Sequence, residues 1–200
     1  MRSYKIYLIR HGLTDGNQNG AYIGSTDLPL SPQGVRNLNN LKEKIDYPAV
    51  EKVYTSPLLR AKQTANILYG DFIAETVDNL REYDFGDFEG KTGAELETHP
   101  DFFKWTSGQI PCPPNGEDST EFAKRVCLGL NQVVLDMMNE GIHTAAVIMH
   151  GGVIMTLLSC TALPRRRSLE WATDAGRGYL ARITPSLYHS SGVIEIVDEI

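Results

Sequence analysis

Two histidines in this sequence directly follow apolar runs, in positions where a titratable ring could do chemistry. In LIRHGLTDGN (residues 8–17) the apolar run ends at Arg10 and His11. In AAVIMHGG (residues 145–152) it ends at His150, which precedes two glycines. A strand that served only a core would end in ordinary turn residues, so we interpret both runs as strands that deliver a reactive group to a chosen place.

The arginines near these runs indicate which ligand such a place would bind. Arg10 precedes His11, and Arg60 stands four positions after Ser56, where a third apolar-rich stretch ends. A guanidinium group repels cations and is not a metal ligand, whereas its planar fork matches the oxygens of a phosphate. We therefore expect a phosphate site with no metal ion and no cofactor. One neutral imidazole would attack phosphorus, while the other histidine and the arginines stabilise the spreading charge.

A phosphate ester also needs a proton on its leaving oxygen, and LREYDFGDFEG (residues 80–90) is rich in carboxylates. A carboxyl group beside a dianionic phosphate has a raised pKa, which suits a general acid near neutral pH. The spacing alone does not show which of the four carboxyl groups this is. The candidates are Glu82, Asp84, Asp87 and Glu89.

The pattern of apolar residues predicts the elements that position these groups. We expect strands over 4–9, 50–55, 145–149, 179–183 and 193–197, the last of them at an edge of the sheet. We expect helices over 32–45, 57–68, 118–139 and 151–162. Serine followed by proline, at Ser31 and again at Ser56, predicts the cap and the first residue of a helix in both places.

The segment 71–115 lacks a clear period and carries prolines, glycines and aromatic residues. It is expected to form short helices and loops, as an irregular helical insert or cap, and function tends to lie in such segments. Its aromatic residues are expected to pack beneath it rather than to stack on a substrate. They are Tyr83, Phe85, Phe88 and Trp105.

Strands and helices alternate along most of the chain, which predicts a single α/β domain over 1–200. Its central sheet should be mostly parallel and flanked by helices on both faces. Ligands of such sheets sit beyond the carboxyl ends of the strands. Arg10, His11, Ser56, Arg60 and His150 would all gather at that edge.

Composition excludes several classes of protein. The net charge of −6 argues against a nucleic-acid partner, and the one dense basic run, residues 165–167, is interpreted as the solvated end of an element. No apolar stretch has the length of a membrane span, and the first residues do not resemble a secretory signal. Three cysteines at unpatterned spacing suit a reducing compartment. We expect a cytoplasmic monomer or homodimer without membrane contacts.

Four motifs, in this order, resemble those of the histidine phosphatase superfamily, also called phosphoglycerate mutase-like. They are RHG with the Thr and Asn that follow it, SPLLRAKQTA (residues 56–65), LREYDFGDFEG (80–90) and MHGG (149–152). The likeness spans residues 5–155, about three quarters of the chain. It implies a mutase-like fold, a small phosphorylated metabolite as substrate, and catalysis without a metal.

The resemblance also implies roles for individual residues. His11 would become phosphohistidine, Arg10, Arg60 and His150 would form the phosphate pocket, and Glu82 would be the proton donor. The predicted substrate-binding residues are Asn17, Thr14, Gly24 and Gly151.

Within the family, the short chain and the stretch after Glu89 resemble alpha-ribazole phosphatases and related sugar-phosphate phosphatases rather than mutases. The sequence departs from the family pattern at Leu13, where the family usually has Glu, and at Gly16, where it often has Trp. Ile23 and Ser25 also differ, so the alcohol portion of the substrate cannot be copied from a relative. Two alternatives are a phosphoglycerate mutase and a non-catalytic module that binds phosphorylated ligands. The module would require a damaged catalytic set.

The stretch CTALPRR (residues 160–166) fits the C-x₅-R spacing of cysteine-dependent phosphatases. That chemistry needs a loop of free N–H groups around the phosphate, whereas this loop contains Pro164 and no glycine. We interpret Cys160 as a small core residue. Three further histidines, His99, His143 and His189, have no comparable context and are interpreted as surface or capping residues.

Overall fold

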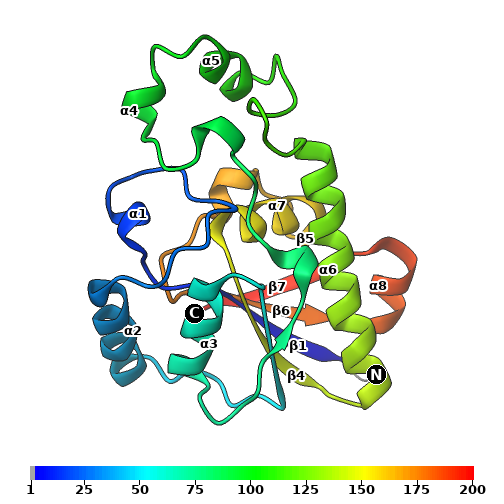
Figure 1. Cartoon of the computed structure of the whole chain (residues 1–200). Coiled ribbons are helices and arrows are strands. Elements are labelled where there is room, and N and C mark those ends of the chain that lie inside the picture. Colours follow the sequence, from blue (N-terminus) through cyan, green and yellow to red (C-terminus); the bar gives the residue numbers. More distant parts are fainter. Residues whose placement is uncertain (1–2) are drawn as a thin grey trace.

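The computed structural model of the chain describes residues 3–200, and a seven-stranded sheet forms its centre (Figure 1). The order across the sheet is β3-β2-β4-β1-β6-β7-β5. The strands are β1 (Tyr4–Arg10), β2 (Lys52–Thr55), β3 (Glu75–Thr76), β4 (Thr144–Met149), β5 (Ala162–Leu163), β6 (Gly178–Ile183) and β7 (Ile194–Glu199). Only β6 runs antiparallel to its neighbours, β1 and β7. The mostly parallel sheet is as predicted.

Eight α-helices and three 3₁₀ helices are described in residues 3–200. The α-helices are α1 (Asp15–Gln18), α2 (Pro32–Lys44), α3 (Leu59–Leu68), α4 (Gly93–Leu96), α5 (Pro100–Thr106), α6 (Ser119–Glu140), α7 (Gly151–Thr161) and α8 (Pro185–Ser191). The 3₁₀ helices are η1 (Asp78–Leu80), η2 (Gly86–Phe88) and η3 (Ser168–Trp171). None of these helices is long and apolar enough to cross a bilayer.

Helices cover both faces of the sheet because alternate strand residues point to opposite sides. In β4, Ala145, Val147 and Met149 belong to a core shared with the apolar stripe of α6 and with α7. Ala146 and Ile148 belong to a second core, shared with α2 and α3. Figure 1 shows α2 and α3 on one side of the strands and α6 with α7 on the other.

The parallel strands β1, β4 and β2 pair in a register that aligns their carboxyl ends, where the site was expected. Ile9 pairs with Ile148, and Thr55 pairs with the same residue from the other side. The residues that follow, Arg10 with His11, His150 and Ser56, therefore leave the sheet side by side. The backbone N–H of His11 donates to Met149 O at 2.9 Å, and that of Ser56 donates to Ile148 O at 2.9 Å.

Local sequence signals explain the helix ends. Ser31 caps α2, its hydroxyl accepting the N–H of Gly34 at 2.9 Å, with Pro32 as the first helical residue. Asp118 caps α6 through the N–H groups of Thr120 and Glu121. Gly141 ends α6 in the left-handed region, with φ of 71°, a conformation that glycine adopts without strain.

The segment 71–115 forms short helices and loops, as predicted; the helices are η1, η2, α4 and α5, and the segment also contains the two-residue strand β3. In Figure 1 the α4–α5 part stands above the body of the molecule. Aromatic rings pack it onto the rest of the chain. Phe88 and Trp105 have ring centroids 5.8 Å apart, and Tyr83 stacks on Trp105 at 6.3 Å.

Two predictions about elements were wrong, and short elements were missed. β7 is not the outermost strand, because the two-residue β5 pairs with Ile194 and Glu195. The strands β3 and β5 were not expected, since two residues carry no period. Ser56 is not a helix cap: α3 begins only at Leu59, and its N-cap residue, Leu58, has no side-chain cap bond.

Candidate active site

His11 is held so that one ring nitrogen is left for chemistry. Its Nδ1 lies 2.5 Å from the backbone oxygen of Gly12. A carbonyl oxygen only accepts, so Nδ1 carries the proton and Nε2 keeps its lone pair. Gly12 is itself fixed, because its N–H donates to the hydroxyl of Thr64 at 2.9 Å.

The surroundings keep His11 uncharged. The side chain is buried, with 4% of its surface exposed. Burial, reinforced by the positive charge of Arg60, lowers the pKa of His11 to about 3. The imidazole is therefore neutral at physiological pH, which a nucleophilic histidine requires.

The two arginines are anchored through their terminal nitrogens. Arg10 donates from Nη1 to Thr173 O at 2.6 Å, and Arg60 donates to Thr26 O at 2.8 Å and to Gly24 O at 2.7 Å. The Nε atoms of both arginines are buried and have no hydrogen-bond partner among the described residues. A buried N–H without an acceptor is costly, and a phosphate oxygen would satisfy it.

His150 lies beside His11, and Ser56 holds it. The two imidazole rings meet edge to face with centroids 5.0 Å apart. His150 Nε2 lies 2.6 Å from the hydroxyl of Ser56, and both residues are fully buried. Because Ser56 Oγ also accepts the N–H of Leu58, its own proton is available for Nε2. With the Ser56 proton donated to Nε2, Nδ1 carries the proton of His150, and Nδ1 has no partner among the described residues.

Among the four carboxylates of residues 80–90, only Glu82 lines the cavity beside His11. Its oxygens accept the N–H groups of Tyr83 and Gly152, each at 2.9 Å. Burial raises the pKa of Glu82, although these two N–H groups and both arginines oppose the shift. A raised pKa suits a group that must hold a proton near neutral pH.

The other three carboxylates have structural partners. Asp84 accepts from Ser25 Oγ and from Gly86 N, and Asp87 accepts from the amide of Asn115. Glu89 accepts the N–H groups of Gly24 and Ser25. Glu82 is therefore the one of the four whose carboxyl group lies in the cavity wall.

A cavity of about 220 Å³ brings most of the predicted site residues together. Its wall contains Arg10, His11, Asn17, Glu82 and Gly151. Arg60 and His150 lie outside the wall and are fully buried. The positive charge of Arg60 helps burial to lower the pKa of His11, and the ring of His150 contacts that of His11 edge to face.

Two predicted substrate-binding residues lie behind the cavity. Thr14 is buried and caps α1, where its hydroxyl accepts the N–H of Asn17 and bonds to the Asn17 side chain at 3.0 Å. Thr14 therefore orients Asn17. Gly24 is packed so closely that a Cβ would lie 1.7 Å from Tyr83 O, and its carbonyl holds Arg60. Neither residue is in the cavity wall.

Sequence reasoning missed two contributors, Gly152 and Phe85. It placed Ser56 at this edge of the sheet but assigned it to a helix cap rather than to His150. Gly152 gives its N–H to Glu82, and a Cβ there would lie 2.5 Å from Glu82 Oε1. Phe85 lines the cavity together with Tyr22, at a ring-centroid distance of 5.1 Å, whereas only a packing role was expected. The glycine pair after His150 was the one signal that could have pointed to Gly152.

The C-x₅-R stretch is not part of this site. Cys160 lies at the end of α7 and is exposed, so the prediction of a core position was wrong. It lines a larger cavity, of about 960 Å³, which contains none of the predicted site residues. His99 caps α5 by accepting the N–H of Asp101 at 3.3 Å, which confirms a capping role. Residues 165–167 are exposed and do not line the candidate site.

Comparisons with known proteins agree with this geometry. The model of the histidine phosphatase superfamily (branch 1) matches residues 6–184. The adenosylcobalamin/alpha-ribazole phosphatase of Salmonella typhimurium (strain LT2) is 30% identical over 161 residues, covering 78% of this chain and 78% of that protein. The uncharacterized phosphatase PhoE of Bacillus subtilis (strain 168) is 32% identical over 157 residues, covering 77% and 75%.

The crystal structure of a phosphoglycerate mutase from Bacillus anthracis superposes with a TM-score of 0.77 at 21% identity, covering 98% of this chain and 92% of that one. This likeness concerns the fold. The chain belongs to the histidine phosphatase superfamily, and it is an enzyme of the phosphatase class.

Proposed function

We propose that the enzyme hydrolyses small phosphomonoesters in two steps, through a phosphohistidine on His11 and without a metal ion. The observation that carries this proposal is the hydrogen bond from His11 Nδ1 to Gly12 O. It leaves a neutral Nε2 in a cavity whose wall also holds Arg10 and Glu82. The nucleophile, an anion-binding group and a proton donor therefore share one small space.

In the first step the Nε2 lone pair attacks phosphorus, and the bond from phosphorus to the alcohol oxygen breaks. The carboxyl proton of Glu82 passes to that oxygen, so the alcohol leaves neutral. Arg10, Arg60 and His150 stabilise the charge on the three equatorial oxygens. The unpartnered Nε atoms of the arginines and Nδ1 of His150 are the donors available for this purpose.

In the second step water attacks the phosphorus of phosphohistidine. The Glu82 carboxylate formed in the first step accepts a proton from this water, and the phosphorus–nitrogen bond breaks. Inorganic phosphate leaves, and both His11 and Glu82 return to their starting protonation states. Glu82 thus acts as acid and then as base, as microscopic reversibility requires.

The substrate side of the cavity favours hydrolysis over the mutase alternative. A phosphoglycerate mutase must hold a second anionic group of its substrate. Arg10 is the one Lys or Arg among the described residues that line this cavity. Besides the catalytic groups, Asn17 and the two glycines, the wall is formed by uncharged residues, namely Ala21, Tyr22, Ile23, Phe85, Met155, Ala172 and Thr173. Such a wall suits an uncharged alcohol.

For the natural substrate we propose a small phosphorylated metabolite, with alpha-ribazole phosphate and small sugar phosphates as the first compounds to test. The names of the relatives and the aromatic rings of Tyr22 and Phe85 support this order. For its location we propose the cytoplasm, which the three free cysteines support. The alternative of a non-catalytic module requires that at least one catalytic group be missing. That alternative loses support, because all of the predicted catalytic groups are present in the sequence.

The experiment that tests the function is p-nitrophenyl phosphate hydrolysis in EDTA, comparing wild type with His11→Ala. We expect activity that survives EDTA and disappears in the variant. Rapid acid and alkaline quenches of the wild type should trap a phosphoenzyme that is labile in acid and stable in base, as a phosphohistidine is.

Other outcomes would redirect the assignment. A wild type without phosphatase activity would favour a mutase, to be assayed with phosphoglycerates, or a binding module. Full activity in His11→Ala would mean that another residue is the nucleophile. Loss of wild-type activity in EDTA, restored by a divalent cation, would overturn the metal-free mechanism.

A further inference from the structure

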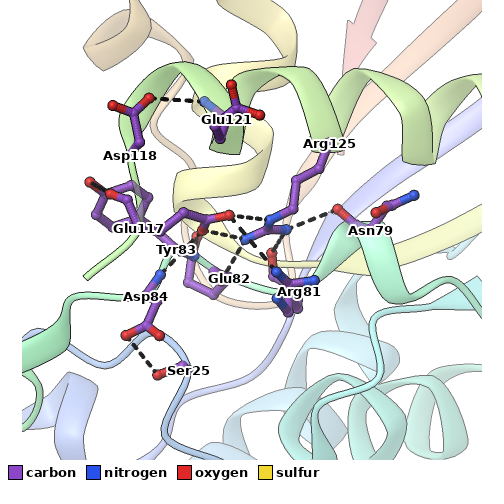
Figure 2. Close-up of polar contacts among 10 residues, drawn as sticks. All are labelled: Ser25, Asn79, Arg81, Glu82, Tyr83, Asp84, Glu117, Asp118, Glu121 and Arg125. Atoms are coloured by element: carbon purple, nitrogen blue, oxygen red, sulfur yellow. Dashed lines mark hydrogen bonds and ion pairs between the residues drawn. The ribbon is translucent and has the colours of Figure 1, made fainter. Parts of the chain in front are cut away.

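Arg125, on α6, lies beneath the loop that carries Glu82 and uses all of its N–H donors there. Nη1 donates to Asn79 O at 3.0 Å and to Arg81 O at 2.7 Å, and Nη2 donates to Glu82 O at 3.0 Å. Nε and Nη2 also donate to the two carboxylate oxygens of Glu117, at 2.6 and 2.7 Å. One side chain thus holds three carbonyl groups within residues 79–82 (Figure 2).

Glu117 binds the next residues of the same loop. Its N–H donates to Asp84 O at 2.9 Å, and its backbone oxygen accepts the hydroxyl of Tyr83. Figure 2 shows Glu117 between Arg125 and the Tyr83–Asp84 backbone. The ion pair is largely buried, with 10% and 13% of the two side chains exposed. A buried pair of this kind needs complete hydrogen bonding to be tolerated, and here it is complete for the guanidinium.

Glu82 is therefore fixed at two points by two different elements. Its carbonyl oxygen accepts from Arg125 on α6, and its carboxylate accepts from Gly152 N at the start of α7. The loop itself contributes the N–H of Tyr83. Without the first point, residues 79–82 would lose the three hydrogen bonds that tie their carbonyl groups to α6, and the carboxyl group would be held less firmly within reach of a leaving oxygen.

We propose that Arg125 and Glu117 form a clamp that positions the general acid, so that they determine how well the enzyme handles poor leaving groups. This inference rests on the proposed function and adds two positioning residues, neither of which lines the cavity. Acid catalysis matters greatly for an alkyl alcohol and little for p-nitrophenol. A misplaced Glu82 should therefore slow the hydrolysis of alkyl phosphates more than that of p-nitrophenyl phosphate. A general loss of rigidity elsewhere in the protein should slow both reactions equally.

The test compares Arg125→Lys and Glu117→Gln with wild type. Arg125→Lys keeps the positive charge but cannot span five acceptors, and Glu117→Gln keeps the shape but loses one carboxylate oxygen. The matched control is the Arg182–Glu195 pair on β6 and β7, also bidentate, at 3.1 and 2.9 Å, but 48% and 31% exposed. Its variants are Arg182→Lys and Glu195→Gln.

The readout is the ratio of kcat/KM for β-glycerophosphate to kcat/KM for p-nitrophenyl phosphate, with thermal unfolding measured in parallel. We expect this ratio to fall about 10-fold or more in both clamp variants, within the range of a general acid's contribution, and to stay constant in both controls. The alkaline limb of the pH profile for β-glycerophosphate should also shift in the clamp variants.

Equal losses on the two substrates, or an unchanged ratio in a folded clamp variant, would overturn the proposal. If Arg125→Lys does not fold, Glu117→Gln decides the question. Failure of the clamp is distinguishable from failure of the proposed function, because the latter is judged in the wild type and in His11→Ala, where the clamp is intact.

Discussion

The imidazoles of His11 and His150 meet edge to face, 5.0 Å apart, with both rings buried. Each ring has one nitrogen fixed by an oxygen, from Gly12 in one case and Ser56 in the other. Burial lowers the pKa of both rings, and each stands near the same two arginines. Two neutral imidazoles can therefore occupy one phosphate site with different roles, one with a free lone pair and one with a free N–H.

Ser56→Ala tests the role of the second ring. Without the hydroxyl, His150 can place its proton on Nε2, and Nδ1 can no longer donate to phosphate. Loss of one such hydrogen bond removes about 1.4 kcal/mol, so kcat for p-nitrophenyl phosphate should fall about 10-fold. Inhibition by inorganic phosphate should weaken in parallel.

The control is Ser31→Ala, since Ser31 is equally buried but caps α2. That change should lower the free energy of unfolding by about 1 kcal/mol and leave kcat as it is. If Ser56→Ala has wild-type kinetics, the orientation of His150 does not depend on this hydroxyl.

Glu82→Gln tests which carboxyl group is the acid. The variant should lose activity on β-glycerophosphate by about 100-fold or more, because glutamine cannot protonate an alkoxide. With p-nitrophenyl phosphate the first step should survive. Slow hydrolysis of phosphohistidine should then produce a burst of p-nitrophenol, which stopped-flow absorbance would record.

Asp84→Asn is the comparison, because Asp84 was the sequence-based alternative and its carboxylate bonds to Ser25 and Gly86. Its activity ratio between the two substrates should match the wild type. A selective loss on the alkyl phosphate in Asp84→Asn, with none in Glu82→Gln, would move the acid role to Asp84.

The gathering of the site residues at one edge of the sheet could be predicted from the sequence, because it follows from the order of the strands. Apolar runs that end in Arg10-His11 and in His150 must bring these residues to the same edge once β1 and β4 pair in parallel. The serine–proline pair at residue 56 was misinterpreted for a physical reason. A serine at the end of a strand can donate its hydroxyl to a neighbour from another strand, and no local pattern shows that neighbour.

The choice of acid and its support could not be predicted in the same way. Glu82 and Asp84 are two positions apart on an irregular loop, and which side chain enters the cavity depends on how residues 79–84 are held. Arg125 holds them from a position 43 residues along the chain from Glu82. The helical period predicts the apolar stripe of α6 but not the acceptors of a long polar side chain. The family resemblance, rather than the spacing, had singled out Glu82.

Gly152→Ala tests how tightly the carboxyl group is placed. An added Cβ would lie 2.5 Å from Glu82 Oε1, so the carboxyl group must shift. A displacement of about 1 Å costs about 100-fold in rate, and the loss should be larger for β-glycerophosphate than for p-nitrophenyl phosphate. Gly93→Ala, where a Cβ meets nothing within 4 Å, should leave both rates unchanged. Equal rates in Gly152→Ala and wild type would show that the carboxyl group tolerates displacement.

The lowered pKa of His11 predicts how stability depends on pH. The unfolded chain binds a proton at this ring below about 6.5, whereas the folded protein does so only near 3. Between these values the unfolded state holds more protons, so the free energy of unfolding falls as the pH falls. The slope from this ring is about 1.4 kcal/mol per pH unit. The contribution of neutral His11 to the free energy of unfolding is therefore complete above pH 6.5 and is lost progressively as the pH falls toward 3.

His11→Asn removes this titration while its side-chain amide can replace the Nδ1 hydrogen bond to Gly12. Urea unfolding between pH 4.5 and 6 should show a slope shallower by about 1.4 kcal/mol per pH unit in the variant than in wild type. The control is Ser31→Ala, which removes no titratable group and affects the cap of α2; its slope should match the wild type. The same slope in His11→Asn and wild type would mean that His11 is protonated at mildly acid pH in the folded protein. A neutral nucleophile would then not exist in that range, and the hydrolysis rate would have to fall with the same midpoint.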